Sequence, residues 1–288
     1  MPASNNSLSA IALMCSATFL FTILDTTAKY LGGTLGLPVL EVVWLRFAGH
    51  TLFAFILFGP KTFTSLVRTR KPLLQISRSI FVASATAFNF LAVTYLQLDL
   101  TMTMFFMTPL IVAILSGPVL GEWVGWHRLM AIAVGFIGVL LVTRPGFGGV
   151  HWAIYFSICA TISYALYFIL TRYLTIHDPV EVTNFYTPIA GAIIAMPFGI
   201  HVWQWPENPF TWFLIALLGI CGGLGHWLVV LASQLAPASI TAPYMYTGLL
   251  SISLMGYLVF GDIPTLWTLA GGLVIILSGL YILFRQKN

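Results

Sequence analysis

The chain has 288 residues, of which 59% are hydrophobic and only 7% are charged. A soluble domain contains about 25% charged residues, so twelve Lys and Arg with eight Asp and Glu are too few to cover the surface of a soluble protein of this length. The composition excludes a soluble enzyme, a secreted domain and a disordered chain, and it requires lipid in place of water over most of the surface.

Ten apolar runs are long enough to cross a bilayer, for which a helix needs about 20 residues. In chain order they cover residues 8–31, 38–59, 74–96, 99–120, 127–143, 151–172, 179–200, 209–232, 238–260 and 265–284. Apart from 60–73, the connections are only a few residues long. Barrel strands would be runs of about ten alternating residues. The runs therefore predict an all-α integral membrane protein with ten transmembrane helices.

Basic residues gather on one side of the membrane if the ten spans alternate from a cytoplasmic N-terminus. Nine of them fall on that side, including Lys61, Arg68, Arg70 and Lys71 in the long early loop, and three fall on the other side. Cytoplasmic loops carry the excess of Lys and Arg. We therefore expect a multi-pass membrane protein with both termini in the cytoplasm. The net charge of +4 reflects this topology and does not indicate a nucleic-acid partner.

The two halves of the chain repeat each other. Four pairs of segments match in the same order at offsets of 137 to 143 residues: Lys29-Tyr30-Leu31 with Arg172-Tyr173-Leu174, Glu41-Val42 with Glu181-Val182, Gln97-Leu98 with Gln234-Leu235, and Gly121-Glu122 with Gly261-Asp262. The copies cover residues 8–143 and 151–284. Five spans in each copy are an odd number, so the second copy must enter the membrane from the opposite side. Inverted repeats are typical of secondary transporters, whose substrate site lies near the midplane between the halves.

The repeated segments also carry a family resemblance. The first copy contains Thr108-Pro109-Leu110, Leu120-Gly121-Glu122 and Gly135-Phe136-Ile137-Gly138-Val139, and the second contains Pro243-Tyr244-Met245-Tyr246-Thr247, Phe260-Gly261-Asp262-Ile263-Pro264, Ala270-Gly271-Gly272 and Gly279. Over essentially its whole length the chain resembles the EamA branch of the drug/metabolite transporter (DMT) superfamily, and within it the bacterial aromatic amino-acid exporters. The resemblance implies two inverted five-helix EamA repeats and a central cavity lined chiefly by spans 1, 3, 4, 6, 8 and 9. It also implies a place in the bacterial inner membrane. Two residues depart from the family pattern: Asp262 replaces the usual Glu, and Leu249 replaces a common Pro.

Charged side chains inside a bilayer are costly, so Asp25, Lys29 and Arg46 need an explanation. Asp25 and Lys29 are four residues apart and can meet on one helix face. At about 1.5 Å per residue, Asp25 lies ~9 Å below the outer end of the first span, and Arg46 lies ~12 Å below the outer start of the second. We expect an Asp25–Arg46 contact in the outer third of the membrane, acting either as a structural ion pair or as a gate or ion-coupling site.

Arg78 lies near the cytoplasmic start of the third span. Its long side chain can reach the lipid headgroups while the stem stays in the apolar layer. Alternatively it faces the cavity, where a guanidinium would hold a substrate carboxylate by two hydrogen bonds.

A pair of polar residues is symmetric between the two copies. His226 in the eighth span shares a helix face with Gly219 and Gly223, where small residues let another helix approach closely. Its counterpart in the third span, at the offset of 137, is Asn89. The pair predicts a substrate contact, although a packed and hydrogen-bonded core histidine is the alternative. Trp227, deep in the same span, is a further substrate-binding candidate.

Tyrosines and prolines complete the candidate site. A tyrosine offers an apolar face and a hydroxyl, which suits ring stacking and substrate ammonium groups, although packing explains each one equally well. Pro109 and Pro243 remove backbone donors from interior turns of spans 4 and 9, where they act either as hinges or as tolerated kinks. The tyrosines in the helices assigned to the cavity are Tyr95, Tyr164, Tyr167, Tyr244 and Tyr246.

The chain lacks the patterns of an intramembrane enzyme. It contains no G-x-S-x-G or H-E-x-x-H motif, no G-x-x-x-x-G-K-[ST] motif for ATP, and no paired cysteine spacing for a metal or a disulfide. We therefore expect no cofactor and no metal, and a monomer or homodimer in the lipid bilayer. The predicted function is secondary transport by alternating access, exporting amino acids with broad specificity that includes aromatic ones. The alternative is a DMT permease for another small metabolite or drug, such as a vitamin, nucleoside, carboxylate or organic cation.

Overall fold

The regular elements of the chain are all helices in the part that the computed structural model describes, which comprises residues 3–59, 63–95, 104–143, 152–261, 263 and 265–286. In order they are α1 (Ala3–Lys29), η1 (Tyr30–Thr34), α2 (Val39–Phe58), α3 (Phe63–Leu66), α4 (Pro72–Tyr95), α6 (Thr108–Leu120), α7 (Trp126–Thr143), α8 (Ile154–Leu174), α9 (Val180–Tyr186), α10 (Ile189–His201), α11 (Pro209–Leu235), α12 (Ala238–Thr241), η3 (Ala242–Tyr246), α13 (Thr247–Met255), η4 (Gly256–Phe260) and α14 (Leu266–Gln286). Here η1 and η4 are π-helical and η3 is a 3₁₀-helix.

These elements correspond to the ten predicted spans. α1 with η1 forms the first span, α9 with α10 forms the seventh, and the series from α12 to η4 forms the ninth. Residues 99–103 of the predicted fourth span lie outside the described residues. Among the described residues, five segments are long and apolar enough to cross a membrane: Asn6–Thr34, Val39–Phe58, Ile154–Leu174, Pro209–Leu235 and Ala238–Phe260. The all-α membrane fold predicted from composition is confirmed.

Prolines divide spans that the hydropathy pattern predicts as continuous helices. Pro188 separates α9 from α10, and Pro243 is the second residue of η3. A proline lacks the N–H that continues the helical hydrogen bonds, and it crowds the preceding turn. Pro109 stands instead in the first turn of α6, where the missing N–H has no helical partner to lose. Pro109 therefore lies inside the fourth span at the point where α6 begins, and its role as a hinge or a tolerated kink stays a prediction.

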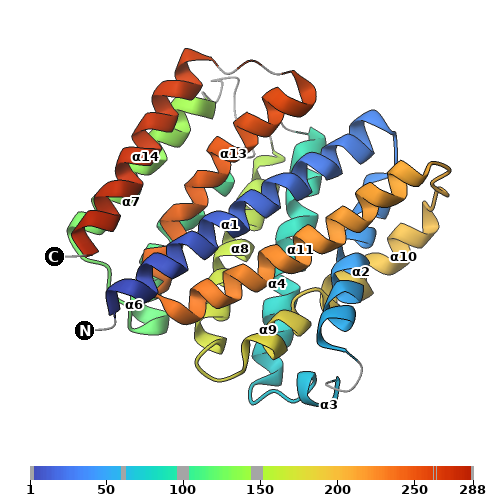
Figure 1. Cartoon of the computed structure of the whole chain (residues 1–288), viewed down its shortest axis with the longest axis horizontal. Helices are drawn as coiled ribbons and strands as arrows, with labels where there is room; N and C mark the ends of the chain where they lie inside the picture. The colour runs from blue at the N-terminus through green and yellow to red at the C-terminus, as the bar shows by residue number, and fades with distance from the viewer. Residues whose placement is uncertain are drawn as a thin grey trace.

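Each contact between two helices has an equivalent contact between their counterparts in the other repeat (Figure 1). α1 lies along α11, and the equivalent pair, α8 and α4, packs in the same way. The contact of α6 with α8 corresponds to that of α13 with α1, while α7 packs on its own counterpart α14 and α2 on its own counterpart α10. The chain is thus two inverted five-helix repeats around a pseudo-two-fold axis.

Glycines bring α2 and α11 into backbone contact. A Cβ atom at Gly219 would lie 2.6 Å from the carbonyl carbon of Gly49, and one at Gly223 would lie 2.3 Å from the ring of Phe53. Small residues at such crossings let helix backbones approach closely in a membrane. The glycine face predicted for the eighth span therefore packs against α2.

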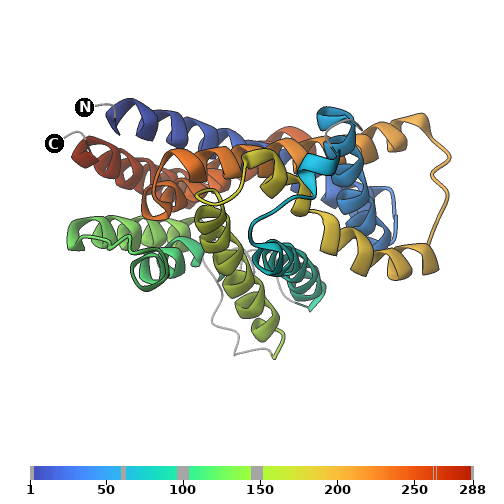
Figure 2. The same ribbon diagram turned by 90° about the horizontal axis from the view of Figure 1, so that it is seen from below.

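Both termini lie close together at one end of the molecule (Figure 2). α6, α8 and α11 end on this side at Leu120, Leu174 and Leu235, and α12 begins there at Ala238. We call this end the terminal face and the other end the opposite face.

Candidate functional site

A cavity lies between the two repeats. Its volume is about 100 Å³. Two pairs of repeat-related residues line it: Phe21 with Tyr164 at an offset of 143, and Asn89 with His226 at an offset of 137. The cavity therefore straddles the pseudo-two-fold axis. Its lining comprises Phe21, Asp25, Arg46, Val82, Ala85, Thr86, Asn89, Phe105, Tyr164 and His226.

Two opposite charges face this cavity. The Asp25 side chain is exposed, and the half-buried Arg46 donates from Nη1 to Thr86 Oγ1 at 3.2 Å. Within the described residues, Asp25 and Arg46 form no ion pair within 4.0 Å, although both line the same cavity. The direct contact predicted for them is wrong, because α1 and α2 both pack against α11 and do not lie side by side. The carboxylate and the guanidinium both remain able to bind a ligand.

Lys29 also departs from its predicted place. Its Nζ lies 4.2 Å from the ring centroid of Phe260 in η4, which is the geometry of a cation–π contact. Lys29 therefore ties the end of α1 to the ninth span at the opposite face and is not part of the Asp25 and Arg46 site.

Aromatic rings form the walls of the cavity. The ring of Phe105 lies 4.9 Å from that of Tyr164, and the ring of Phe21 lies 4.8 Å from that of His226. Such faces accommodate a planar or apolar part of a ligand. Tyr164 is thus one of the predicted residues that lines the cavity.

His226 is held from behind by Tyr167. The hydroxyl of Tyr167 and Nδ1 of His226 are 2.8 Å apart, and the rings of His226 and His50 stack with centroids 5.5 Å apart and planes at 7°. Tyr167 is completely buried and stands behind the cavity wall as the orienting partner of His226.

Arg78 takes neither of the two places predicted for it. It is completely buried and donates to Thr171 Oγ1 at 3.1 Å, to Thr187 Oγ1 at 2.6 Å and to the carbonyl of Thr183. Ser79 donates to the carbonyl of Thr187 at 3.0 Å. These side chains satisfy backbone groups freed where Pro188 divides the seventh span, which lipid could not do.

Four more predicted residues lie away from the cavity. Tyr95 is 52% exposed and its ring lies 5.1 Å from that of Trp152, whereas Trp227 packs on Phe58 with ring centroids 5.8 Å apart. Tyr244 donates to the carbonyl of Gly279 at 3.1 Å and Tyr246 to that of Ile132 at 3.5 Å. A helix that lines a cavity presents only one face to it, and these side chains occupy other faces.

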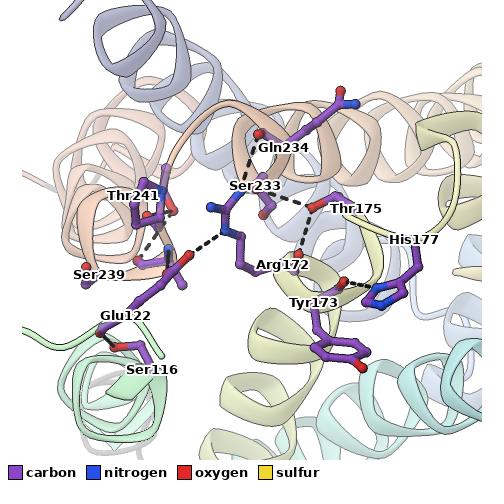
Figure 3. Close-up of polar contacts among 12 residues, drawn as sticks. Ser116, Glu122, Arg172, Tyr173, Thr175, His177, Ser233, Gln234, Ser239 and Thr241 are labelled. Atoms are coloured by element: carbon purple, nitrogen blue, oxygen red, sulfur yellow. Dashed lines mark hydrogen bonds and ion pairs between the residues drawn. The ribbon is translucent and has the colours of Figure 1, made fainter. Parts of the chain in front are cut away.

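At the terminal face, a cluster of polar contacts joins four helix ends, and we call this cluster the clasp (Figure 3). Arg172 Nε lies 2.7 Å from Glu122 Oε1, and both side chains are about 15% exposed. Arg172 Nη1 also donates to the carbonyls of Ser233 at 2.6 Å and Gln234 at 3.3 Å. Glu122 Oε2 accepts a hydrogen bond from the Ala238 N–H at 2.8 Å. The ends of α6, α8 and α11 and the start of α12 are thereby held together.

A second polar cluster ties loops together at the same face. Asp178 accepts hydrogen bonds from the Arg70 N–H at 2.9 Å, from Gln75 Nε2 at 3.0 Å and from the Thr69 hydroxyl. Burial acts to raise the pKa of Asp178, but the hydrogen bonds from Thr69, Arg70 and Gln75 outweigh it and leave the pKa below its ordinary value.

Sequence reasoning missed several of these functional groups. Phe21 could have been found by carrying the offset of 143 from Tyr164 into the first span, and Thr86 by its position one helical turn before Asn89. Nothing in the sequence pairs Glu122 with Arg172, which are fifty residues apart.

Comparisons with known proteins agree with this architecture. The profile of the EamA-like transporter family matches residues 8–144 and 151–285. A solved structure titled only as a crystal structure of a protein superposes with a TM-score of 0.79 at 16% identity, covering 97% of this chain and 99% of that chain. At this identity the likeness concerns the fold alone.

Three kinds of curated relative are similar over nearly their whole length. The S-adenosylmethionine uptake transporter of Rickettsia felis is 27% identical, covering 92% of this chain and 88% of that protein. The riboflavin transporter of Vibrio cholerae is 27% identical, covering 93% of this chain and 91% of that protein. The pseudopaline exporter of Pseudomonas aeruginosa is 24% identical, covering 94% of both chains.

Proposed function

Because the chain belongs to the EamA-like transporter family of the DMT superfamily, we propose that it is a secondary transporter for a small metabolite with an α-amino-acid head group. Alternating access of the cavity between the two repeats would carry this substrate across the membrane. The family and its relatives are membrane transporters of small molecules rather than enzymes.

The single observation that supports this substrate class is the pair of separated charges in the cavity. Asp25 offers a carboxylate to an ammonium group, and Arg46 offers a guanidinium to a carboxylate. Aromatic walls at Phe21, Phe105 and Tyr164 suit a ring on the same molecule. The free amino acids expected from the sequence, aromatic ones included, fit this description.

The relatives support a second candidate substrate. Two relatives that match 92% of this chain are named as transporters of S-adenosylmethionine. This compound carries an α-amino-acid head group and an adenine ring. Riboflavin, named for another relative, has no such head group. The relatives' names include both uptake and export, so the outward direction expected for amino acids is part of the proposal.

We further propose that the terminal face is cytoplasmic in a bacterial inner membrane. The excess of basic residues on that side of the chain supports this orientation. With the clasp of Glu122 and Arg172 formed there, the present conformation would be closed toward the cytoplasm. A reporter that is active only outside the cytoplasm, fused to the C-terminus, is expected to be inactive, and its activity would reverse the orientation.

Purified protein in liposomes tests the substrate class. Labelled phenylalanine, S-adenosylmethionine, riboflavin, a nucleoside and a dicarboxylate are compared with empty liposomes and with the Asp25→Asn variant. Transport of phenylalanine or S-adenosylmethionine that Asp25→Asn weakens is the expected result. Transport of riboflavin or the nucleoside alone would refute the head-group proposal. Transport without an imposed gradient would indicate facilitated diffusion.

A further inference from the structure

A group of buried polar atoms without hydrogen-bond partners lies beside the cavity, next to His226. They are Nε2 of His226, Nε2 of His50, and the Nδ2 and Oδ1 atoms of Asn184. The three side chains are 0–2% exposed, and they come from α11, α2 and α9. Asn184 lies within reach of His50, yet neither of its amide atoms makes a hydrogen bond of ordinary geometry. Buried polar groups are nearly always paired, so these unpaired atoms are available to bind the polar atoms of a ligand.

This cluster adjoins the cavity and lies deeper in the membrane. His226 belongs to both, because it also lines the cavity. His50 follows Arg46 by four residues on α2, which places it ~6 Å nearer the terminal face at 1.5 Å per residue. A ligand that binds Arg46 could therefore reach the cluster by moving about one helical turn along the path of transport.

The cluster presents hydrogen-bond donors. The Arg78 guanidinium lies 5.3 Å from the ring of Tyr167, and its charge favours a hydroxyl hydrogen that points away from it, onto His226 Nδ1. A neutral imidazole that accepts at Nδ1 carries its proton on Nε2. His226 Nε2 is then a donor, and the Asn184 amide supplies two more.

Charge in this part of the membrane is also unbalanced. Arg46 and Arg78 both act electrostatically on the imidazoles of His50 and His226. Asp25 is the acid that acts on Arg46, and Arg78 has no acid partner among the described residues. Two guanidinium charges and one carboxylate leave a net charge of +1. Such an interior favours an anionic oxygen group over a cation.

We propose that His50, Asn184 and His226 form a second, deeper subsite that binds the carboxylate of the substrate after it leaves Arg46. This inference rests on the proposed function, since it assigns the carboxylate of the head group to two successive positions. The carboxylate moves between the subsites as the clasp at the terminal face opens.

A cysteine at the subsite tests the inference without a known substrate. Asn184→Cys is introduced into a variant in which Cys15, Cys159 and Cys221 are replaced by Ala. In liposomes it is treated with the anionic reagent 2-sulfonatoethyl methanethiosulfonate and with the cationic 2-(trimethylammonium)ethyl methanethiosulfonate. Glu181→Cys, exposed on the same helix, is the matched control. His50→Cys repeats the measurement from α2 if Asn184→Cys does not fold.

The expected result is a preference for the anionic reagent of about fivefold or more at the subsite, relative to the control cysteine. L-phenylalanine or S-adenosylmethionine should slow the reaction, and phenethylamine, which lacks a carboxylate, should not. Equal relative rates, or no reaction while Glu181→Cys is fully labelled, would overturn the subsite. A preference for the anionic reagent that neither compound slows would support the subsite and overturn the amino-acid head group of the proposed function.

Discussion

Arg172 and Glu122 form an ion pair, with Nε and Oε1 2.7 Å apart, in which each partner also binds the end of another helix. Arg172 donates to the last carbonyls of α11, and Glu122 accepts from the first N–H of α12. Each charge therefore has the sign that the dipole of the helix end it contacts favours. The pair therefore depends on which position holds the acid and which holds the base, as well as on the two charges being opposite.

Exchanging the two charges of the clasp should not restore it. In the double variant Glu122→Arg with Arg172→Glu, a carboxylate would face the carbonyls of Ser233 and Gln234, and a guanidinium would face the Ala238 N–H. We expect Glu122→Gln and the double variant both to lower the free energy of unfolding by about 1 kcal/mol. Thermal unfolding in detergent measures this loss. Full recovery in the double variant would show that only the charge pair matters.

Asp25→Asn should weaken transport without weakening the fold. The carboxylate faces the cavity and forms no ion pair with Arg46 within the described residues, so a neutral amide removes a ligand for ammonium and little packing. Affinity for phenylalanine should fall roughly tenfold, which corresponds to about 1.4 kcal/mol. Uptake kinetics give the affinity and the melting temperature gives the stability. A large fall in melting temperature with unchanged affinity would make Asp25 a structural residue.

Removal of the Tyr167 hydroxyl should lower the stability of the protein more than removal of the Tyr164 hydroxyl. Tyr167→Phe leaves Nδ1 of the buried His226 unpaired, at a cost of about 1–3 kcal/mol. Tyr164→Phe, on the adjoining cavity wall, is the matched control and should change stability by less. Equal melting temperatures for the two variants would contradict this role of Tyr167.

Arg78→Lys should be strongly destabilising. An ammonium cannot reach Thr171, Thr187 and the Thr183 carbonyl together, as the guanidinium does. The break before Pro188 would then contain unsatisfied groups, which we expect to lower the free energy of unfolding by about 3 kcal/mol. Arg68→Lys, on the exposed loop, serves as the control. A shift as small as that of Arg68→Lys would mean that water replaces the guanidinium.

The loops that meet at Asp178 should loosen in acid. Its pKa is below the ordinary value because hydrogen bonds favour the ionised form, so its contribution is present above the ordinary pKa and is lost as the pH falls through the folded value. Asp178→Asn should remove that part of the acid dependence. Limited proteolysis of the loop at residues 67–71 between pH 7 and pH 3 measures this loosening. Identical acid profiles for both proteins would assign the change to another group.

The membrane fold, the ten spans and the inverted duplication follow from the sequence alone. A backbone in lipid must satisfy its own polar groups, so helix length and hydropathy are local properties that can be read residue by residue. The repeat offset likewise paired Asn89 with His226, and both residues line the cavity, although no contact between the spans was known.

The faces of those helices were decided only by tertiary packing. Tyr244, Tyr246 and Trp227 lie on the correct spans but point away from the cavity, because the rotation of each helix depends on close approaches such as that of Gly49 to Gly219. The contact of Lys29 with Phe260 likewise depends on how α1 is rotated against its neighbours. The pairing of Glu122 with Arg172 also depends on where four helix ends meet. Local hydropathy contains no information about such a meeting, since it is the sum of many small packing energies between segments far apart in the chain.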